Sequence, residues 1–444
     1  MTVRIAIVGT GHVGLTTAAC FAHVGHEVLG VDDDPEKIAL IGRGDLPFYE
    51  PGLTELVREG LDTGRLKVSP EAAEAARFGD VVFICVGTPT RPTGEANLVQ
   101  VERVSTTVAR NLERYTVVAE KSTVPVETGV WVRRAIERAA PEGAEFDVVS
   151  NPEFLREGRA IQDTLEPDRI VVGSSSPKAV EQLREVYRPI LDRVGCPFVV
   201  TDLSTAELIK HACNAFLATK ISFVNALADI CEKTGADIET VSAAMGLDPR
   251  IGPAFLRAGI GYGGACLPKD VQAFRYRAKE LGIDLGLMDQ VHDVNEQRIE
   301  KFIDKIRSVV WNLEGKRIAI WGLAFKPDTD DLRNAPALEV VRHLLAERAE
   351  VAVHDPAAMP EAKKLIPEAR FFPTPNEAAT GADCLAICTE WQEYATADLG
   401  HLREVMAEPV VVDGRNLFPP EHMARAGFSY ASIGRPTVSP AHEQ

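Results

Sequence analysis

The sequence lacks any run of apolar residues close to the roughly 18 that a membrane-spanning helix needs. It also lacks a cluster of lysine and arginine, and its formal net charge over 444 residues is −17 at pH 7. A chain with this charge would repel the phosphates of a nucleic acid. We therefore expect neither a membrane nor a nucleic acid as a partner.

Cysteine pairs are missing as well. The eight cysteines have neither the paired spacing of a zinc site nor that of a small disulfide scaffold, so no metal is expected. Most of them, including Cys85, Cys213 and Cys384, lie in apolar runs typical of core packing. The N-terminal residues do not show a basic region, an apolar core and a cleavage site in succession. These features predict a cytoplasmic protein.

The composition is that of an ordinary globular protein, with 45% hydrophobic and 25% charged residues. The length predicts two or three domains, each with its own core. Composition alone assigns no chemistry, so the prediction of function depends on local motifs.

The first motif is a glycine turn at residues 9–14, between an apolar, β-branched run at residues 3–8 and a small-residue stretch at residues 15–24. Its glycines are Gly9, Gly11 and Gly14. Strand, glycine turn and helix in this order bind the pyrophosphate of a dinucleotide at the helix N-terminus. A glycine turn without a cofactor is the alternative.

A carboxylate supports the dinucleotide interpretation. A second strand at residues 27–31 ends at Asp32, where a carboxylate accepts hydrogen bonds from the adenosine ribose. Asp33 and Asp34 follow, and three carboxylates together would repel a 2′-phosphate. NAD is therefore favoured over NADP.

Further apolar runs alternate with charged helical segments, which predicts a doubly wound parallel sheet. These runs lie at residues 81–86, 116–119, 146–150 and 170–173. Polar groups follow three of the strands, where open α/β sheets bind ligands. They are found at residues 88–89, 121–125 and 151–157.

The segment after residue 150 predicts the start of a helix. Asn151 and Pro152 suit an N-cap and a first helical position, which would place Glu153 and Glu157 on one helix face. Two roles are open for these glutamates: a part in function, or favourable charge near a helix N-terminus.

Residues 202–233 contain no glycine or proline and repeat apolar residues at helical spacing, which predicts one long helix. Lys210 and Asn214 are four residues apart and would share one face of it. A lysine on such a helix is most often solvated, so this position alone does not assign a function.

A glycine-rich loop at residues 261–270 contains Cys266, Lys269 and Asp270. Glycines allow close approach of the backbone and positive φ angles, and a nearby cation such as Lys269 favours the thiolate. We interpret Cys266 as a catalytic nucleophile. The alternative is a small buried hydrophobe.

Near residue 312 the alternation of strand and helix restarts. Strands are expected at residues 316–321, 351–354, 385–388 and 410–413, with a helix at residues 335–347. Arg333 and Arg415 supply cations suited to a diphosphate. The last dozen or so residues, with two prolines and little apolar content, are expected to form a loose tail.

Taken together, these motifs resemble the nucleotide-sugar dehydrogenases, the UDP-glucose/GDP-mannose dehydrogenase family. The resemblance covers nearly the whole chain, and its motifs occur in the family's order. They are the glycine turn with Asp32 and Lys37, residues 47–53, 87–89, 122–125, 151–158 and 167–173, Lys210 with Asn214, and residues 263–270 and 322–333.

The resemblance implies an α/β fold with two Rossmann-like, doubly wound parallel-sheet domains joined by a long central helix and a helical middle region. It implies an N-terminal NAD-binding domain at residues 1–202 and a central helical dimerisation region with the catalytic cysteine loop at residues 203–311. A C-terminal domain that binds the nucleotide sugar would span residues 312–444. A homodimer through the central helix is implied as well.

The resemblance also implies a four-electron oxidation, in which C6 of a hexose changes from alcohol to carboxylate with two NAD and one water. Cys266 would capture the aldehyde as a thiohemiacetal and then carry a thioester, which water hydrolyses. Lys210 and Asn214 would stabilise the oxyanion. Asp270 would position or deprotonate water and hydroxyl, and Thr123 would hold the same water.

The family pattern carries further residues over to this chain. Glu153 and Glu157 would lie beside the reacting centre. For the cofactor it implies Gly9, Gly11, Val13, Gly14, Asp32, Lys37, Thr88, Thr123, Glu157, Lys269 and Arg333. For the UDP-sugar it implies Glu153, Phe154, Leu155, Arg156, Lys210, Asn214, Arg250, Phe255, Leu256, Arg257, Ala258, Gly259, Gly263, Lys326 and Arg415.

Two residues of the cysteine loop depart from the family, which usually has Phe and Ser where this chain has Tyr262 and Ala265. The sequence at residues 266–268 also occurs in the GDP-mannose branch, whereas residues 151–173 and 246–252 resemble the UDP-glucose branch more. A thymidine diphosphate sugar, a two-electron hydroxyacid dehydrogenase and a binding protein without catalysis stay open as alternatives.

Overall fold

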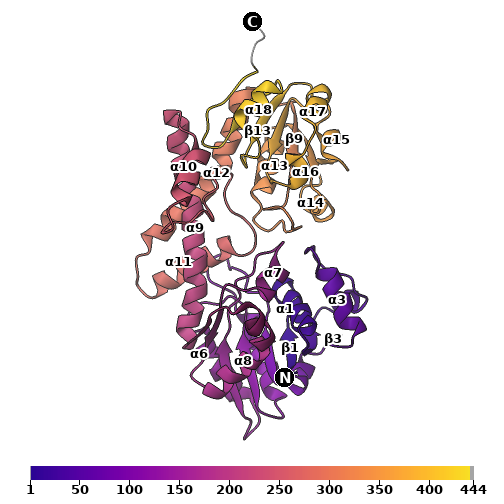
Figure 1. Ribbon diagram of the computed structural model, residues 1–444, viewed down its shortest axis with the longest axis vertical. Helices are drawn as coiled ribbons and strands as arrows, with labels where there is room; N and C mark the ends of the chain where they lie inside the picture. The colour runs from indigo at the N-terminus through magenta and orange to yellow at the C-terminus, as the bar shows by residue number, and fades with distance from the viewer. Residues whose placement is uncertain (1, 441–444) are drawn as a thin grey trace. The chain divides into compact units, whose positions relative to one another are not determined.

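The computed structural model describes residues 2–440, which divide into two compact units (Figure 1). The first unit runs to Cys213 and also includes Gln272–Ile283. The second consists of Asn214–Val271 and the chain from Asp284 onward. Two helices belong to both units, α9 (Leu203–Thr234) and α11 (Leu267–Glu280). The predicted division at residues 202 and 311 stays a prediction.

The first unit is built on an eight-stranded sheet in the order β3-β2-β1-β4-β5-β6-β7-β8. Its strands are β1 (Arg4–Val8), β2 (Glu27–Val31), β3 (Leu66–Ser69), β4 (Val81–Ile84), β5 (Thr116–Glu120), β6 (Phe146–Ser150), β7 (Ile170–Gly173) and β8 (Phe198–Thr201). All neighbours are parallel except β6 and β7, which meet antiparallel. The first six strands have the order of a dinucleotide-binding sheet, which confirms the predicted fold class.

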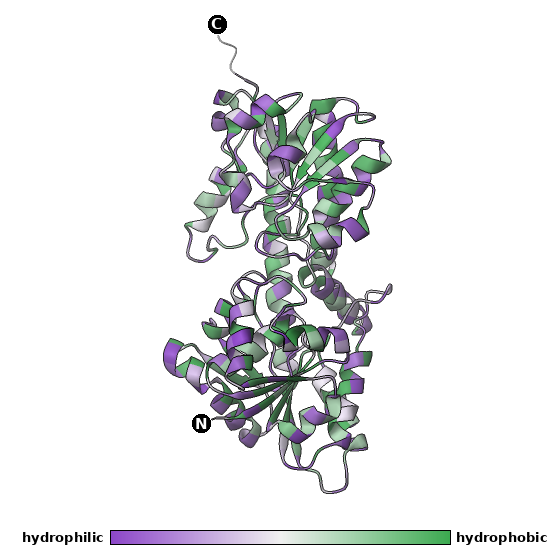
Figure 2. Cartoon of the chain, turned by 90° about the vertical axis from the view of Figure 1, so that its right-hand side faces the viewer, coloured by the Kyte–Doolittle hydropathy of each residue, from purple (hydrophilic) through white to green (hydrophobic). Residues whose placement is uncertain are grey.

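Helices cover both faces of this sheet. They are α1 (His12–His23), α2 (Pro35–Gly42), α3 (Leu53–Asp62), α4 (Ala72–Phe78), α5 (Val99–Arg110), α6 (Thr128–Ala139), α7 (Ala160–Leu165) and α8 (Pro177–Val194). One core cluster joins the sheet to α1 and α8, and another joins it to α5 and α6. Because both faces of the middle of the sheet are buried, the central strands β1, β4 and β5 are apolar along most of their length, and the sheet is largely green in Figure 2.

The second unit has a six-stranded parallel sheet in the order β11-β10-β9-β12-β13-β14, the same order as in the first unit. Its strands are β9 (Arg317–Trp321), β10 (Glu350–His354), β11 (Arg370–Phe371), β12 (Cys384–Ile387), β13 (Val410–Asp413) and β14 (Ser429–Ser432). The strand order reverses between β9 and β12, and ligands bind such sheets at this point, beyond the carboxyl ends of the strands.

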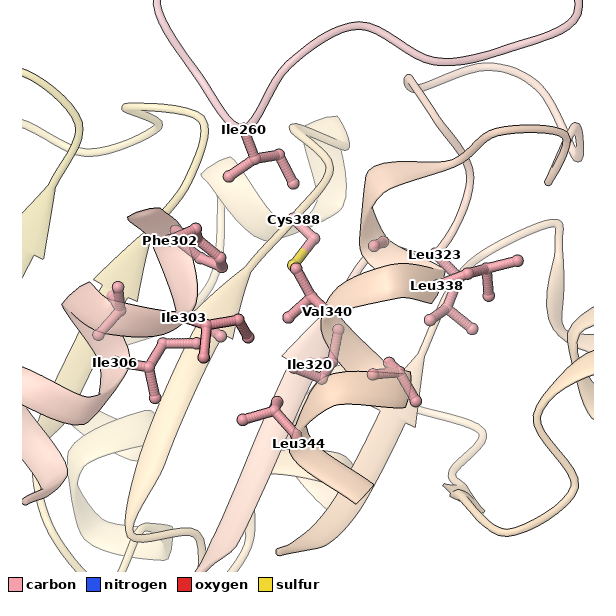
Figure 3. Packing of buried hydrophobic residues seen from close by; sticks show 14 of the residues in the cluster. Ile260, Phe302, Ile303, Ile306, Ile320, Leu323, Leu338, Val340, Leu344 and Cys388 are labelled. Carbon is pink, nitrogen blue, oxygen red and sulfur yellow. The ribbon is translucent and has the colours of Figure 1, made fainter. Parts of the chain in front are cut away.

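The core of the second unit brings long helices against this sheet. Figure 3 shows Phe302 and Ile306 of α12 (Gly286–Val310) near Ile320 of β9 and Leu344 of α13 (Pro336–Ala346). Shorter helices complete the unit: α10 (Ile238–Gly246), α14 (Met359–Leu365), α15 (Pro375–Ala379), α16 (Gln392–Ala395), α17 (Leu399–Val405) and α18 (Pro420–Arg425). Within residues 2–440, no helix combines the length and apolarity needed to cross a bilayer.

The predicted helix start at Asn151 is wrong. The chain from Asn151 to Arg156 is irregular, and the next helix, α7, begins only at Ala160. Asn151 does not cap a helix, because its amide donates to Val171 O (2.8 Å) and its Oδ1 accepts from Tyr187 and Lys121. A buried tertiary network therefore outweighs the local preference for a helix.

The predicted loose tail is also wrong where the structure describes it. Arg435 is buried and donates to Phe418 O (3.0 Å) and to the Tyr430 hydroxyl (2.8 Å). Val438 forms a bridge with Tyr430. Residues 441–444 lie outside the described residues.

Candidate active site

The glycine turn of the first unit has the geometry of a pyrophosphate cradle. Gly9 has φ +98°, and a Cβ there would lie 2.7 Å from Cys85 O. A Cβ on Gly14 would lie 1.8 Å from Gly9 O, so only glycine lets α1 pack this close to the turn. A Cβ on Gly11 would meet nothing within 4 Å, which leaves space where a phosphate can approach the N-terminus of α1.

Asp32 lies at the end of β2, as a ribose-binding carboxylate requires. Its Oδ2 accepts hydrogen bonds from Thr10 N (2.8 Å), Thr10 Oγ1 (2.9 Å) and Lys37 Nζ (2.9 Å). Burial opposes ionisation of this carboxyl, but the bonds from Lys37 and Thr10 outweigh it and lower the pKa of Asp32. An ionised Asp32 fits the ribose hydroxyls of NAD and would repel a 2′-phosphate.

Two loops at the carboxyl end of the sheet are tied together. The Thr88 hydroxyl, after β4, donates to the carbonyl of Thr123, after β5 (2.8 Å). The Ser122 hydroxyl donates back to Val86 O (2.8 Å). The first unit therefore brings together Thr88 and Thr123, two residues predicted to serve the cofactor and the reaction.

Lys210 and Glu153 form a buried ion pair in the same unit. Lys210 Nζ lies 3.0 Å from Glu153 Oε1, and both side chains are about nineteen-twentieths buried, at 5% and 6% exposed. The other Glu153 oxygen accepts from Leu155 N (2.8 Å). Lys210 also lies 5.5 Å from the centre of the Phe154 ring. A buried ammonium beside an apolar ring would stabilise a developing oxyanion strongly.

The segment between β6 and α7 is held from elsewhere in the unit. Glu50 accepts hydrogen bonds from Gly158 N (2.7 Å) and Ala160 N (2.8 Å). Arg156 pairs with Asp163 (2.6 Å), and Glu157 is buried. Glu50 lies within the sequence motif at residues 47–53, but the sequence did not reveal what this carboxylate binds.

In the second unit, Cys266 directly precedes α11 and is exposed. Asp270 N donates to Cys266 O (2.9 Å), which closes the first turn of the helix. The Asp270 carboxylate is 2% exposed and accepts from Asn214 Nδ2 (2.6 Å) and Lys269 Nζ (2.7 Å). The structure therefore brings Asn214, Lys269 and Asp270 together at the helix end that carries the thiol. Thiolates are favoured near helix N-termini.

The glycines of the cysteine loop fit against the loop after β9. A Cβ on Gly263 would lie 2.3 Å from Asn334 O, and one on Gly264 would lie 2.8 Å from the Phe325 ring. Gly264 N donates to Arg333 O (2.9 Å), and Asn334 Nδ2 donates to Gly264 O (3.1 Å). These glycines hold the cysteine loop in place, a role that their sequence spacing did not distinguish from contact with a ligand.

Five predicted ligands of the nucleotide sugar, residues 255–259, come from the segment before this loop, and Phe255 is partly buried. Gly259 N donates to Asn225 Oδ1 (2.8 Å). Leu256 and Ala258 are buried, whereas Arg257 is exposed. Leu256 and Ala258 would therefore meet a ligand through their backbone, and Arg257 through its side chain.

Several predicted cations of the second unit form ion pairs or lie close to rings. Arg415 binds Glu390 (2.6 Å), and although burial opposes it, this contact lowers the pKa of Glu390. Arg333 binds Asp331 (2.7 Å), and Lys326 lies 5.4 Å from the Phe325 ring. Arg250 pairs with Asp248 but is 87% exposed.

Asp355 ends β10, the strand that corresponds to β2 of the first unit. Its Oδ2 accepts from Leu323 N (2.7 Å), Ala324 N (3.0 Å) and Trp391 Nε1 (3.2 Å). Its Oδ1 accepts from Ala357 N (2.9 Å) and Ala358 N (2.8 Å). This carboxylate therefore closes the turn after β9 instead of facing a ribose.

No group of three or more possible metal ligands occurs within the described part of the chain, residues 2–440. The first unit contains a dinucleotide cradle, and the second contains a thiol, a carboxylate and an amide. The chain belongs to the UDP-glucose/GDP-mannose dehydrogenase family. Its NAD-binding model matches residues 3–191, its central-domain model residues 204–297 and its UDP-binding model residues 319–420.

Individual relatives agree with this assignment. A UDP-glucose 6-dehydrogenase of Rhizobium meliloti is 45% identical over 98% of this chain and 100% of its own. TuaD of Bacillus subtilis, another UDP-glucose 6-dehydrogenase, is 43% identical over 98% of this chain and 94% of its own. The solved UDP-glucose dehydrogenase of Pyrobaculum islandicum is 37% identical, with a TM-score of 0.91 and 98% coverage of both chains.

A solved UDP-D-ManNAc dehydrogenase of Pyrococcus horikoshii is also similar. It is 29% identical, with a TM-score of 0.85 and coverage of 97% of this chain and 99% of its own. The fold is therefore shared by relatives that are named for different sugars, and the fold alone does not select the sugar.

Proposed function

We propose that this protein is a UDP-glucose 6-dehydrogenase, which oxidises C6 of UDP-glucose to the carboxylate with two NAD through covalent intermediates on Cys266. The full-length match to UDP-glucose 6-dehydrogenases supports the substrate and the cofactor. The observation that carries the covalent route is the exposed Cys266 at the start of α11, one turn from the hydrogen-bonded Asn214–Asp270 pair.

NAD, bound at the glycine turn by Asp32 and the N-terminus of α1, supplies the hydride acceptor for each oxidation. Asp270, through a water, takes the hydroxyl proton as C6 becomes an aldehyde. The Cys266 thiolate then forms a bond to C6 and gives a thiohemiacetal, whose oxyanion Lys210 and Asn214 stabilise.

Loss of a second hydride from C6 converts the thiohemiacetal to a thioester. Water held by Thr123 and Asp270 then attacks C6, and the carbon–sulfur bond breaks to release the carboxylate and regenerate the thiol. The sum is UDP-glucose, two NAD⁺ and one water giving UDP-glucuronate, two NADH and three protons.

The remaining predicted residues have binding roles in this proposal. Arg333 and Lys269 serve the cofactor, with Val13, Lys37, Thr88 and Glu157. The sugar and its diphosphate are held by Glu153, Phe154, Leu155, Arg156, Phe255, Leu256, Arg257, Ala258, Gly259, Gly263, Lys326 and Arg415. The match to the UDP-binding model supports a UDP-sugar as the ligand of the second unit.

The test is the number of NADH formed per molecule of limiting nucleotide sugar, for the wild type and Cys266→Ser. UDP-glucose is compared with GDP-mannose, UDP-N-acetylmannosamine and TDP-glucose. Two NADH with UDP-glucose, and loss of complete turnover in Cys266→Ser, are expected. One NADH, or a mutant with full turnover, would contradict the covalent route. Preference for another sugar would move the protein to a different branch of the family.

The long helix α9 supports a homodimer. Phe216, Phe223 and Ile230 lie at seven-residue spacing on it and are 65%, 53% and 58% exposed. This spacing places them on one face of the helix, where apolar side chains pack well against a second copy of the same helix. Arg250 has an exposed side chain, and in such a dimer it would reach the substrate bound by the partner subunit. We place the protein in the cytoplasm, where nucleotide sugars and NAD are available.

A further inference from the structure

Four buried polar residues form one stripe along α9. Glu207, Lys210, His211 and Asn214 are spaced i, i+3, i+4 and i+7, which is one face of a helix, and they are 2%, 4%, 2% and 8% exposed. Lys210 and Asn214 have roles in the proposed reaction. Glu207 and His211 have none, and they bind the loop that follows Thr123.

Glu207 holds the beginning of α6 with both carboxylate oxygens. Its Oε2 accepts from Glu127 N (2.7 Å), and its Oε1 accepts from Gly129 N (2.6 Å). The N-cap residue of α6 makes no side-chain capping bond of its own. Two backbone N–H groups at the start of this helix are therefore satisfied by the carboxyl group of a residue on another helix.

The backbone at Glu127 is strained. Its φ angle is +79°, a region that side chains other than glycine rarely adopt. Such a conformation persists only where the surroundings enforce it, and strain of this kind concentrates at functional sites. Two contacts hold this conformation of Glu127. Its backbone N–H donates to Glu207, and its side chain pairs with Arg277 of α11.

His211 holds the same loop one turn further along α9. Its Nε2 lies 2.8 Å from Val124 O, and the ring lies parallel to Phe274 with centres 6.0 Å apart. Val124 directly follows Thr123, whose own carbonyl accepts from Thr88. The position of Thr123 is thus fixed on one side by Thr88 and on the other by α9.

We propose that Glu207 and His211 are positioning residues that place the Thr123 hydroxyl for the water that hydrolyses the thioester. This proposal rests on the proposed function. Through Glu207 and His211, the helix that carries Lys210 also holds Thr123, so the position of Thr123 is set relative to the oxyanion-stabilising ammonium. The two residues act through the loop.

The first measurement is hydrogen exchange of the peptide that contains residues 124–130. Glu207→Ala removes the acceptor of two backbone N–H groups, a buried one at Gly129 and a partly buried one at Glu127, so exchange of this peptide should be at least about tenfold faster than in the wild type. Glu207→Gln keeps one acceptor oxygen and should lie between the two. This readout does not depend on the substrate, so it remains informative if UDP-glucose is not oxidised.

The second measurement is steady-state turnover with UDP-glucose. Because a displacement of about 1 Å costs up to about 100-fold in rate, kcat of Glu207→Ala and of His211→Ala should fall about 10- to 100-fold. KM for UDP-glucose should stay within about threefold, since uniform binding is not affected. Thr123→Ala gives the size of effect expected when the hydroxyl is absent altogether. His211→Gln, which keeps a donor near Val124 O, should recover part of the lost kcat.

Asp398→Ala is the matched control. The Asp398 carboxylate caps α17 by accepting hydrogen bonds from Gly400 N (2.9 Å) and His401 N (3.1 Å), as Glu207 does for α6. Asp398→Ala should lower the melting temperature and leave kcat unchanged. If Glu207→Ala, Glu207→Gln and His211→Ala behave like Asp398→Ala, the positioning role is overturned and the proposed function stands. A different result is a wild type that fails to oxidise UDP-glucose while exchange of residues 124–130 still rises in Glu207→Ala. That result would overturn the proposed function and with it the role in hydrolysis, and would leave only the structural contact of Glu207 with the start of α6.

Discussion

Asn214 Nδ2 donates a hydrogen bond of 2.6 Å to Asp270 Oδ2, and both side chains are buried. The other oxygen of Asp270 accepts from Lys269. An amide and an ammonium thus hold the carboxylate one helical turn beyond Cys266. This arrangement holds a carboxylate that can accept a proton one turn from the thiol.

Asp270→Asn should keep the size of this side chain and remove its capacity to accept a proton. We expect kcat to fall by about 100-fold or more, the usual contribution of a general base, with little change in KM for UDP-glucose. Steady-state kinetics would measure it, with Glu361→Gln, an exposed carboxylate on α14, as the control. An equal fall of kcat in both variants would show that Asp270 does not act as the general base.

Asp32→Asn should relax the choice of cofactor. In the proposed function the ionised Asp32 faces the adenosine ribose, and Lys37 Nζ lies 2.9 Å from this carboxylate. Without the charge, Lys37 is available for a 2′-phosphate, so the NAD to NADP ratio of kcat/KM should fall about tenfold or more. An unchanged ratio would place the source of selectivity elsewhere. Asp62→Asn, at an exposed residue that ends α3, is the control.

Glu120→Gln should alter the pH dependence of stability. Burial raises the pKa of Glu120 to about 8, although contacts with Ser122 lower it in part. The folded protein therefore keeps a proton that the unfolded chain releases, so the free energy of unfolding falls as pH rises from about 4.5 to about 8. The glutamine amide of Glu120→Gln does not ionise, so this fall in the free energy of unfolding is absent in the variant.

The measurement for Glu120 is the melting temperature from pH 5 to pH 8.5. The variant and the wild type should agree near pH 5, and the variant should melt about 3–6 °C higher at pH 8.5. Part of the fall should remain in the variant, because burial also raises the pKa of Glu207 to about 7. Parallel curves would rule out ionisation of Glu120 as a cause.

Phe223→Asp should disrupt the proposed dimer. A charge on the exposed apolar face of α9 would have to be buried in the contact between two copies, which is costly. Light scattering should show the mass of one chain for this variant and of two chains for the wild type. Leu365→Asp, at an exposed apolar residue of α14, should leave the mass unchanged. A wild-type monomer would remove the dimer from the proposal.

The parts of the fold that follow from local pattern were predicted well. The helix expected at residues 202–233 is α9, Leu203–Thr234, because an unbroken run of helix formers is a local property. The strand at residues 146–150 is β6 with the same bounds. The glycines of the first turn have the steric roles expected of their spacing.

What the sequence could not predict depends on partners far along the chain. Asn151 has the local preference of an N-cap, but Lys121 and Tyr187 compete for its side chain. Glu50 and Glu207 bind backbone N–H groups more than 75 positions away. The signal for Glu207 was present in the spacing of polar residues along an otherwise apolar helix, and only the fold shows what they bind.

The hydrogen bonds of Asp355 have a consequence for the order of events in the proposed reaction. The second unit repeats the strand order of the first, yet its equivalent carboxylate is saturated by backbone and indole N–H groups, so it offers no ribose acceptor there. In the proposed reaction the dinucleotide cradle at Gly11 must then serve twice per substrate. Spent coenzyme has to depart and a fresh molecule arrive while the sugar stays tethered to sulfur. In this scheme the lifetime of the covalent intermediate, rather than affinity for a free aldehyde, determines what fraction of the sugar is oxidised fully to the carboxylate.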